Sequence, residues 1–232
     1  KDPNVTLLVE QEAEAVARDE GAVREKIKEM LEARLAGHNV EVWPANSGAV
    51  PDNQPCFLVA YLPLEFAAKP KAERQAAAKE IFANYGDKPR QFRNGLALAV
   101  PAADQIQALR RAVRYLLSID RVKTKAKQHN LTDEQRGQLR EREATEKVAA
   151  ESAFLKLYTE VWLPKLDNSA IVIEPVELGG MPLQTTLNDK KEARIHERVM
   201  ELITQLKKRV FDSLNPGKIV ESFKLGDLPA EG

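Results

Sequence analysis

Apolar positions recur along this chain with two different periods, and together they predict a mixture of helices and strands. Over residues 11–36, 70–85 and 103–117 an apolar residue returns every three or four positions, which is the spacing of a helix with one buried face. The same spacing over 189–214 predicts a last amphipathic helix, which ends before Pro216.

Four short segments predict strands between these helices. Residues 57–62 and 96–100 are continuous apolar runs, each followed by a proline, as in strands buried on both faces. Residues 39–43 and 170–173 are two further strand candidates. Because strand, helix, strand and helix follow one another, the sequence predicts an α/β fold. We expect a helix-rich chain with a small, mostly parallel sheet of three to four strands and crossover helices.

A long helical excursion is predicted beyond Leu131. Thr132 followed by Gln135 fits a capping box at a helix start, and Pro164 is the expected stop. The first half is almost entirely polar and apolar residues return from Val148, so we expect an exposed first half and a buried second half. The predicted elements divide the chain into three parts. These are an α/β core with a basic middle region over 1–128, the long helix over 129–168, and a strand with a C-terminal amphipathic helix packing on the core over 169–232.

Composition narrows the class of protein. Hydrophobic residues make up 43% and charged residues 30%, which is typical of a globular chain, and no apolar run approaches the roughly 18 to 20 residues of a membrane-spanning helix. Aromatic residues are only 6%, too few for a surface that stacks bare nucleic-acid strands. Cys56 is the single cysteine and no signal-peptide pattern is present, so we expect a cytoplasmic protein with no membrane partner. The chain begins at Lys1 rather than Met, and we expect it to be a piece of a longer protein.

The formal net charge is zero, but the charges are unevenly distributed. Residues 1–68 carry 6 basic and 12 acidic side chains, whereas residues 69–127 carry 14 basic and 5 acidic ones, a net charge of +9. Such a cluster attracts phosphate or nucleic acid, or it solvates a helix and pairs with the acidic first third. The candidate nucleic-acid-binding residues are Arg110, Arg111, Arg114, Arg121, Lys123, Lys125 and Lys127.

A second polar cluster lies in the loop over 86–94, directly before an expected strand. Arg90 and Arg93, with Asn94, are positioned to reach the sheet edge and bind a phosphate, a carboxylate or a neighbouring subunit. The alternative is an ordinary loop whose arginines pair with Asp87 or cap helix carbonyls.

Motifs for a self-contained active site do not occur in the sequence. No phosphate-binding loop, dinucleotide fingerprint or nucleophile motif is present, and the three histidines are isolated from one another and from Cys56. We therefore expect no catalytic residues, no metal and no cofactor of its own in this chain.

The order of several motifs resembles a known family. The chain is similar to the downstream region of the large bacterial ATP-binding proteins of unknown function that accompany DNA methylases in phage-defence gene clusters. The resemblance covers about residues 15 to 225, and the segments that carry it are Val42-Trp43-Pro44, Pro51-Asp52, the run 57–63, Arg90-Gln91-Phe92-Arg93-Asn94-Gly95-Leu96-Ala97-Leu98 and Ala112-Val113-Arg114-Tyr115-Leu116. Gly95 stands where the family more often has Thr, and Leu117-Ser118 where it has Ala-Trp.

This resemblance implies a non-catalytic or site-completing module of a phage-defence ATPase. ATP would then be a cofactor of the full-length protein, with the Walker motifs outside this chain, and the partner would be the rest of the parent chain. Arg90 and Arg93 would contact nucleotide phosphate or a neighbouring subunit, which also makes a homo-oligomer an alternative partner. Two other functions stay open: a sequence-nonspecific nucleic-acid-binding module that uses the basic region 110–127 on DNA phosphates, and a scaffold for another protein.

Overall fold

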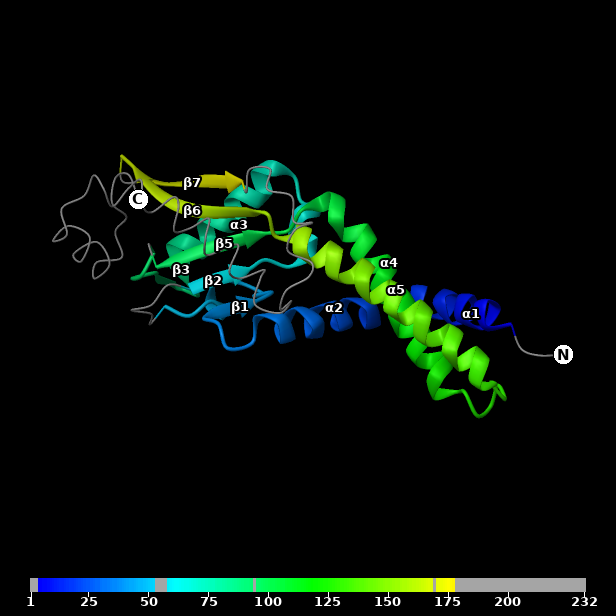
Figure 1. The fold of residues 1–232 in the computed structure, drawn as a ribbon. Coiled ribbons are helices and arrows are strands. Elements are labelled where there is room, and N and C mark those ends of the chain that lie inside the picture. The colour runs from blue at the N-terminus through cyan, green and yellow to red at the C-terminus, as the bar shows by residue number, and fades with distance from the viewer. Residues whose placement is uncertain (1–3, 53–57, 94, 169, 178–232) are drawn as a thin grey trace. The chain divides into compact units, whose positions relative to one another are not determined.

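The computed structural model describes residues 4–52, 58–93, 95–168 and 170–177. Within these residues the chain is α/β, with five α-helices and a five-stranded mixed sheet (Figure 1). One compact unit, the helical unit, takes residues up to Leu31 together with Asp104–Lys156. The other, the sheet unit, takes Glu32–Ala103 together with the described residues from Leu157 onward. The helix expected over 189–214 lies outside the described residues.

Three parallel strands form one half of the sheet. The strands β1 (Val40–Val42), β2 (Leu58–Tyr61) and β5 (Leu96–Val100) are neighbours in that order, and Leu58 of β2 lies opposite Leu96 of β5. Every residue of β2 and β5 is buried. The prediction that these two apolar runs lie side by side and are covered on both faces is therefore confirmed.

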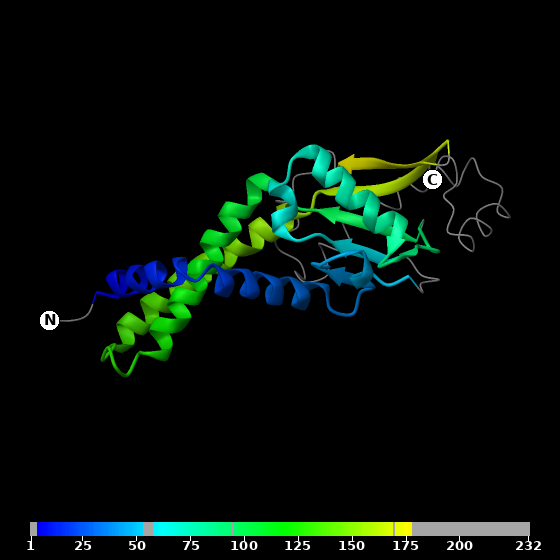
Figure 2. The same ribbon diagram turned by 180° about the vertical axis from the view of Figure 1, so that it is seen from behind.

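The crossover between β2 and β5 contains α3 (Lys71–Ala83), which lies against one face of the sheet in both views (Figures 1 and 2). Its buried residues pack against alternate residues of the strands, because successive strand residues point to opposite faces. The resulting core includes Leu58, Ala60, Leu62, Ala78, Ile81, Phe82, Leu96, Leu98 and Val100. Two short 3-10 turns, η1 (Ser47–Ala49) and η2 (Leu64–Ala68), and a small hairpin, β3 (Asn84–Tyr85) with β4 (Lys88–Pro89), complete the connections.

The other half of the sheet corrects the sequence prediction. Residues 158–163, expected as the end of a long helix, lie partly in strand β6 (Glu160–Asp167), which pairs antiparallel with β5 and with β7 (Ala170–Glu177). The sheet therefore has five strands rather than three or four. Asp167 pairs with Ala170, so only two residues connect β6 and β7, and Asn168 has a φ of 47° as the turn requires.

Pro164 does not stop a helix but lies within β6. Pairing with β5 ends at Trp162, so Pro164 removes no hydrogen bond from that ladder. Pro175 lies in β7, which is the edge strand of the sheet among the described residues. Both prolines thus occupy strand positions that tolerate a missing N–H group.

The helical unit contains α1 (Val5–Ala17), most of α2 (Glu20–Leu35), α4 (Ala103–Thr124) and most of α5 (Asp133–Leu157). The helix expected over 11–36 is divided, and Asp19 caps the start of α2 through a bond from Ala22 N to Asp19 Oδ1 (3.1 Å). A core shared by α1, α4, α5 and the α4–α5 connection consists of Val5, Val9, Ile119, Val122, Leu131 and Leu139.

The start of α5 is the capping box that the sequence predicts. Gln135 N donates to Thr132 Oγ1 (3.2 Å), and Thr132 N donates to the Gln135 side chain (2.9 Å). The long α4 runs seven residues beyond the predicted end at 117, because Ile119 and Val122 continue its buried stripe. Among the described helices, none combines the length and apolar character needed to cross a membrane.

Candidate functional site

Arg90 lies directly after β4 and its side chain is only 1% exposed. Its guanidinium faces the backbone of the sheet unit rather than solvent. The Nε group donates to Ile81 O (2.8 Å), and Nη1 donates to Pro51 O (2.8 Å). The Nη2 group is within hydrogen-bond distance of three more carbonyl oxygens, those of Ser47 (3.2 Å), Val50 (3.0 Å) and Asn84 (3.2 Å).

Asp52 provides the charge partner of this buried cation. Its Oδ1 lies 3.8 Å from Arg90 Nη1, and its two oxygens accept bonds from Gln91 N (2.8 Å) and Phe92 N (3.0 Å). Burial lowers the pKa of Arg90 from its usual value, while the negative charge of Asp52 opposes that shift. The pair therefore joins the loop after β1 to the loop before β5.

This geometry corresponds to the second interpretation of the loop. Arg90 N also donates to Ala83 O (2.7 Å), so its backbone and side chain together satisfy carbonyls at the end of α3. The N–H groups with which Arg90 would bind a phosphate already donate to backbone carbonyl oxygens. Arg93 is half-buried and donates from Nε to Arg90 O (3.2 Å), and Asn94 lies outside the described residues.

The carboxyl ends of β1 and β2 are occupied by packed aromatic side chains. Trp43, with a φ of 53°, donates from its indole Nε1 to the Tyr158 hydroxyl (3.0 Å), which in turn donates to Leu62 O (2.8 Å). The rings of Tyr61 and Tyr158 meet edge to face with centroids 4.9 Å apart. Burial raises the pKa of both tyrosines above the usual value, so both remain neutral. In open α/β sheets this edge often binds ligands, but here it belongs to the core.

The predicted basic region lies on α4 and the turn that follows it, and its members differ in their surroundings. Arg111 and Arg114 lie beside the ring of Tyr115, with guanidinium carbons 5.7 and 5.3 Å from its centroid. Arg142 of α5 lies 5.4 Å from the same ring, and Glu10 of α1 accepts the Tyr115 hydroxyl (3.0 Å). This cluster joins three helices and is part of the packing of the helical unit.

Two further residues of the predicted basic region are paired with acidic side chains. Lys123 forms an ion pair with Glu143, and Lys125 forms one with Glu12. The bond from Lys123 lowers the pKa of Glu143 from its usual value, against a smaller opposing effect of burial. Glu12 belongs to the acidic first third, so part of the basic charge is paired internally, as one interpretation of the sequence expected.

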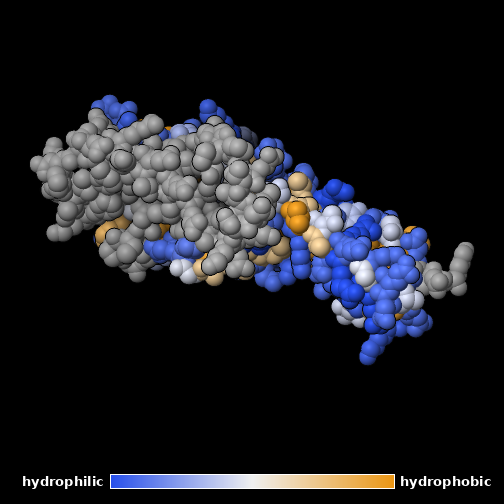
Figure 3. Space-filling model, viewed as in Figure 1, coloured by the Kyte–Doolittle hydropathy of each residue, from blue (hydrophilic) through white to orange (hydrophobic). Residues whose placement is uncertain are grey.

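The remaining members have no acidic partner within the part of the chain that the structure describes. Arg110 and Lys127 are exposed, and Arg121 is half-buried. Arg110, Arg114 and Arg121 share one face of α4, because eleven residues make three helical turns. The surface of the helical unit is predominantly hydrophilic in the view of Figure 3.

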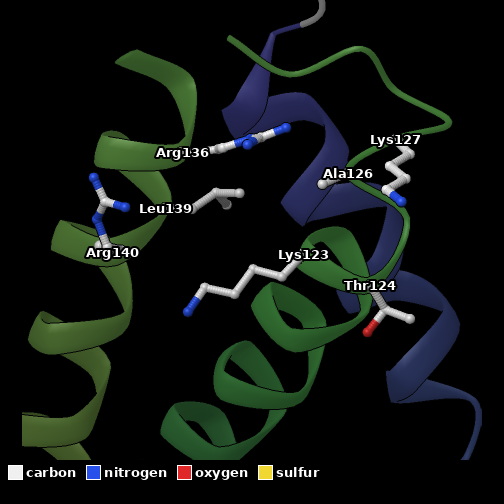
Figure 4. A pocket seen from close by; sticks show the side chains of 7 residues that line it. All are labelled: Lys123, Thr124, Ala126, Lys127, Arg136, Leu139 and Arg140. Atoms are coloured by element: carbon white, nitrogen blue, oxygen red, sulfur yellow. The ribbon is translucent and has the colours of Figure 1, made fainter. Parts of the chain in front are cut away.

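A pocket of about 470 Å³ lies where α4 ends and α5 begins (Figure 4). We call it the basic pocket. Lys123 and Lys127 line it from the end of α4 and the following turn, Arg136 and Arg140 line it from α5, and Ala126 and Leu139 lie among them. Thr124 also lines it, but its hydroxyl already donates to Asp120 O (2.9 Å).

Sequence reasoning missed Arg136 and Arg140. Both fall in the polar first half of the expected helix, and their spacing of four places them on one face. The capping box at Thr132 fixed the start of that helix, so the signal was present. What the sequence did not show is that this face lies beside Lys123 and Lys127.

None of the three comparisons with known proteins finds a match. Searches of family models, curated proteins and solved structures return no similar chain. The family resemblance thus remains a hypothesis based on the order of motifs. Among the described residues, no group of three or more potential metal ligands comes together.

Proposed function

We propose that this chain is a non-catalytic module of a larger cytoplasmic ATP-dependent protein, and that its helical unit binds the phosphate backbone of duplex nucleic acid without reading sequence. The observation that carries the nucleic-acid part of this proposal is the group of basic side chains that lack an acidic partner among the described residues. Arg110, Arg121 and Lys127 belong to it, and so does Arg140 of the basic pocket.

Unpaired basic side chains on one unit favour phosphate binding over simple surface solvation. Each Lys or Arg that contacts a phosphate releases condensed counterions, and this release supplies most sequence-independent affinity. Lysine and arginine heads on a helix face reach phosphates without entering a groove, so the contact positions the duplex but carries no base specificity. The low aromatic content, 6%, favours a duplex over a bare strand.

The ATPase part of the proposal rests on the resemblance alone. In this proposal ATP binds upstream, in the rest of the parent chain, and the chain described here supplies a binding surface. A site-completing role through Arg90 is not favoured, because its guanidinium is directed at five carbonyl groups. Arg93 keeps that role as a hypothesis, with a neighbouring copy or the parent chain as the partner.

Fluorescence anisotropy of a labelled 20-base-pair duplex, titrated with the chain at several salt concentrations, tests the proposed function. The informative variant is Arg110→Glu with Arg121→Glu, because Arg114 packs on Tyr115 and its loss would disturb the fold. A matched control is Lys71→Glu with Lys79→Glu on α3, which makes the same change of charge on exposed residues of the sheet unit.

We expect the logarithm of the binding constant to fall linearly with the logarithm of the salt concentration. The Arg110/Arg121 variant should weaken binding at least tenfold and reduce the slope by about 2, roughly 0.9 for each lost phosphate contact. The α3 control should retain the wild-type slope. Absence of binding at 50 mM salt, or an equal loss in the control, would contradict the proposed function.

A further inference from the structure

The basic pocket has features that binding of a nucleic-acid phosphate backbone to the surface of α4 does not require. Its lining contains four cationic side chains from two segments of the chain, and its volume of about 470 Å³ is within the range of small-ligand sites. A phosphate in the middle of a duplex backbone lies on a convex surface and would contact only the rim of such a pocket. A group that projects from its parent molecule can enter it.

We propose that the basic pocket binds a terminal phosphate, that is, a phosphomonoester carried by a nucleotide or by the end of a nucleic-acid strand. This inference deepens the proposed function and rests on it for the strand-end source of the phosphate. The pocket's own chemistry does not depend on duplex binding.

The charge of the pocket selects a dianion. Four cations line it, and the acidic groups paired with them in the structure are Glu143, with Lys123, and Asp133, whose Oδ1 lies 3.9 Å from Arg136. Even with both carboxylates counted, an excess of two positive charges remains. A phosphomonoester carries about −1.5 to −2 at pH 7, whereas a backbone diester carries −1. The monoester therefore matches the excess charge better.

Two of the four cations are available to a ligand without breaking a contact. Lys127 and Arg140 have no ion pair with any residue that the structure describes, and they stand on opposite sides of the pocket in Figure 4. The Arg140 guanidinium extends along α5 in Figure 4, so it must turn about its side-chain bonds to present two parallel N–H groups to a phosphate in the pocket, and Lys127 adds a point charge from the other side. The aliphatic side chains of Ala126 and Leu139 lie between these two cations and give the pocket an apolar border.

A competition assay with paired DNA ligands tests this inference. Two otherwise identical duplexes, one with 5′-phosphate ends and one with 5′-hydroxyl ends, compete for the full chain against a labelled duplex. The pocket variant is Lys127→Gln with Arg140→Gln. The matched control is Arg110→Gln with Arg121→Gln, which removes the same two charges outside the pocket lining.

We expect the wild-type chain to prefer the phosphorylated duplex about tenfold, the size of one charge-assisted hydrogen bond. The pocket variant should lose this preference and bind the two duplexes equally, although more weakly than the wild-type chain, because Lys127 and Arg140 also belong to the unpaired basic group. The control should bind both duplexes more weakly and keep their ratio. Circular dichroism at 222 nm, unchanged in both variants, shows that the helical unit is folded. Equal affinity for the two duplexes, or a preference that survives in the pocket variant, would overturn the strand-end inference.

A second experiment distinguishes a free nucleotide from a strand end as the source of the phosphate. It also tests the pocket independently of the proposed duplex binding. Adenosine, adenosine monophosphate and inorganic phosphate are titrated into the chain by calorimetry. Binding of the monophosphate but not of adenosine, lost in the pocket variant, supports the pocket even if no duplex binds, in which case only the proposed function fails. Duplex binding without end preference, together with no binding of the monophosphate, overturns the inference and leaves the proposed function standing. With neither ligand bound, both fail.

Discussion

Replacement of Arg90 by methionine gives the sharpest test of how the sheet unit is held together. Arg90→Met keeps an unbranched stem that reaches about as far as the arginine Nε, but it removes the guanidinium with every donor and the positive charge. Five carbonyl oxygens and the carboxylate of Asp52 would then lose their donor or charge partner in a buried site. We expect a large loss of stability in the sheet unit.

The size of this loss follows from the burial of the site. The Arg90 side chain is 1% exposed and Asp52 8%, so water cannot replace the lost donors without a change of structure. Removing one partner of a buried, hydrogen-bonded charge pair costs about 3 to 5 kcal/mol. The separate bonds do not add, because a relaxed loop can satisfy some carbonyls. We therefore expect the free energy of unfolding to fall by about 3 to 5 kcal/mol, a large part of the 5 to 15 kcal/mol typical of a domain.

Urea denaturation followed by tryptophan fluorescence measures this change. The chain has two tryptophans, Trp43 and Trp162, and both lie in the sheet unit, so the signal reports on the unit that contains Arg90. A suitable control is Arg93→Met, since Arg93 is half-buried and donates a single bond to Arg90 O. That variant should lose only about 0.5 to 1.5 kcal/mol.

The reasoning would be refuted if Arg90→Met unfolded within 1 kcal/mol of the wild-type chain, or no more easily than Arg93→Met. Arg90→Lys provides a further check. A lysine keeps the charge near Asp52 but has three donors on one nitrogen, so it cannot reach carbonyls on several segments at once. We expect its stability to lie between those of the wild-type chain and Arg90→Met.

Three other predictions concern the helical unit. Thr132→Ala removes the side-chain cap of α5 and should lower stability by about 1 kcal/mol, as measured by thermal melts at 222 nm, whereas Thr132→Ser should be nearly neutral. Tyr115→Phe keeps the ring beside its arginines but removes the bond to Glu10, so we expect a loss of about 0.5 to 1.5 kcal/mol in the same melts, and a larger loss for Tyr115→Ala. The pKa of Glu143 is lowered in the folded chain, so its pairing with Lys123 stabilises the fold above the unfolded pKa, and this contribution is lost as the pH falls through the folded pKa. Glu143→Gln should flatten that part of the acid-unfolding profile, and an unchanged profile would contradict the assignment.

The parallel half of the sheet was predictable because its pattern is local. Residues 57–62 and 96–100 are apolar without interruption and each run is followed by a proline, a combination that few structures other than a buried strand explain. The capping box of α5 was predictable for the same reason, since all its atoms lie within four residues.

The strand β6 was missed because its signal is ambiguous. Val161 and Trp162 continue the apolar spacing of α5, and a proline two residues later is a common helix stop. The better evidence was Asn168 in a polar turn directly before a run rich in β-branched residues, Ile171, Val172 and Ile173, which is typical of a two-residue hairpin.

The surroundings of the predicted site residues are set by parts of the chain that are distant in sequence. Arg90 was recognised as special, but its carbonyl partners at Ser47, Val50 and Pro51 are about 40 residues away, and no local pattern shows that they surround it. The basic pocket likewise requires that the end of α4 and the start of α5 meet. A local pattern indicates which residues carry charge, and only the tertiary fold decides whether that charge is buried, paired or accessible.

The helical unit is built from two segments that are far apart in the sequence, and this separation has a consequence for biosynthesis. The buried side of α1 contains Val5 and Val9, whose core partners Ile119 and Val122 are translated more than 100 residues later. At about 5 to 20 residues per second, a ribosome needs roughly 5 to 20 seconds to synthesise the intervening chain. During that interval the apolar stripe of α1 has no α4 to cover it. The apolar side chains of the α1 segment therefore stay without their α4 partners until most of the described chain has been synthesised.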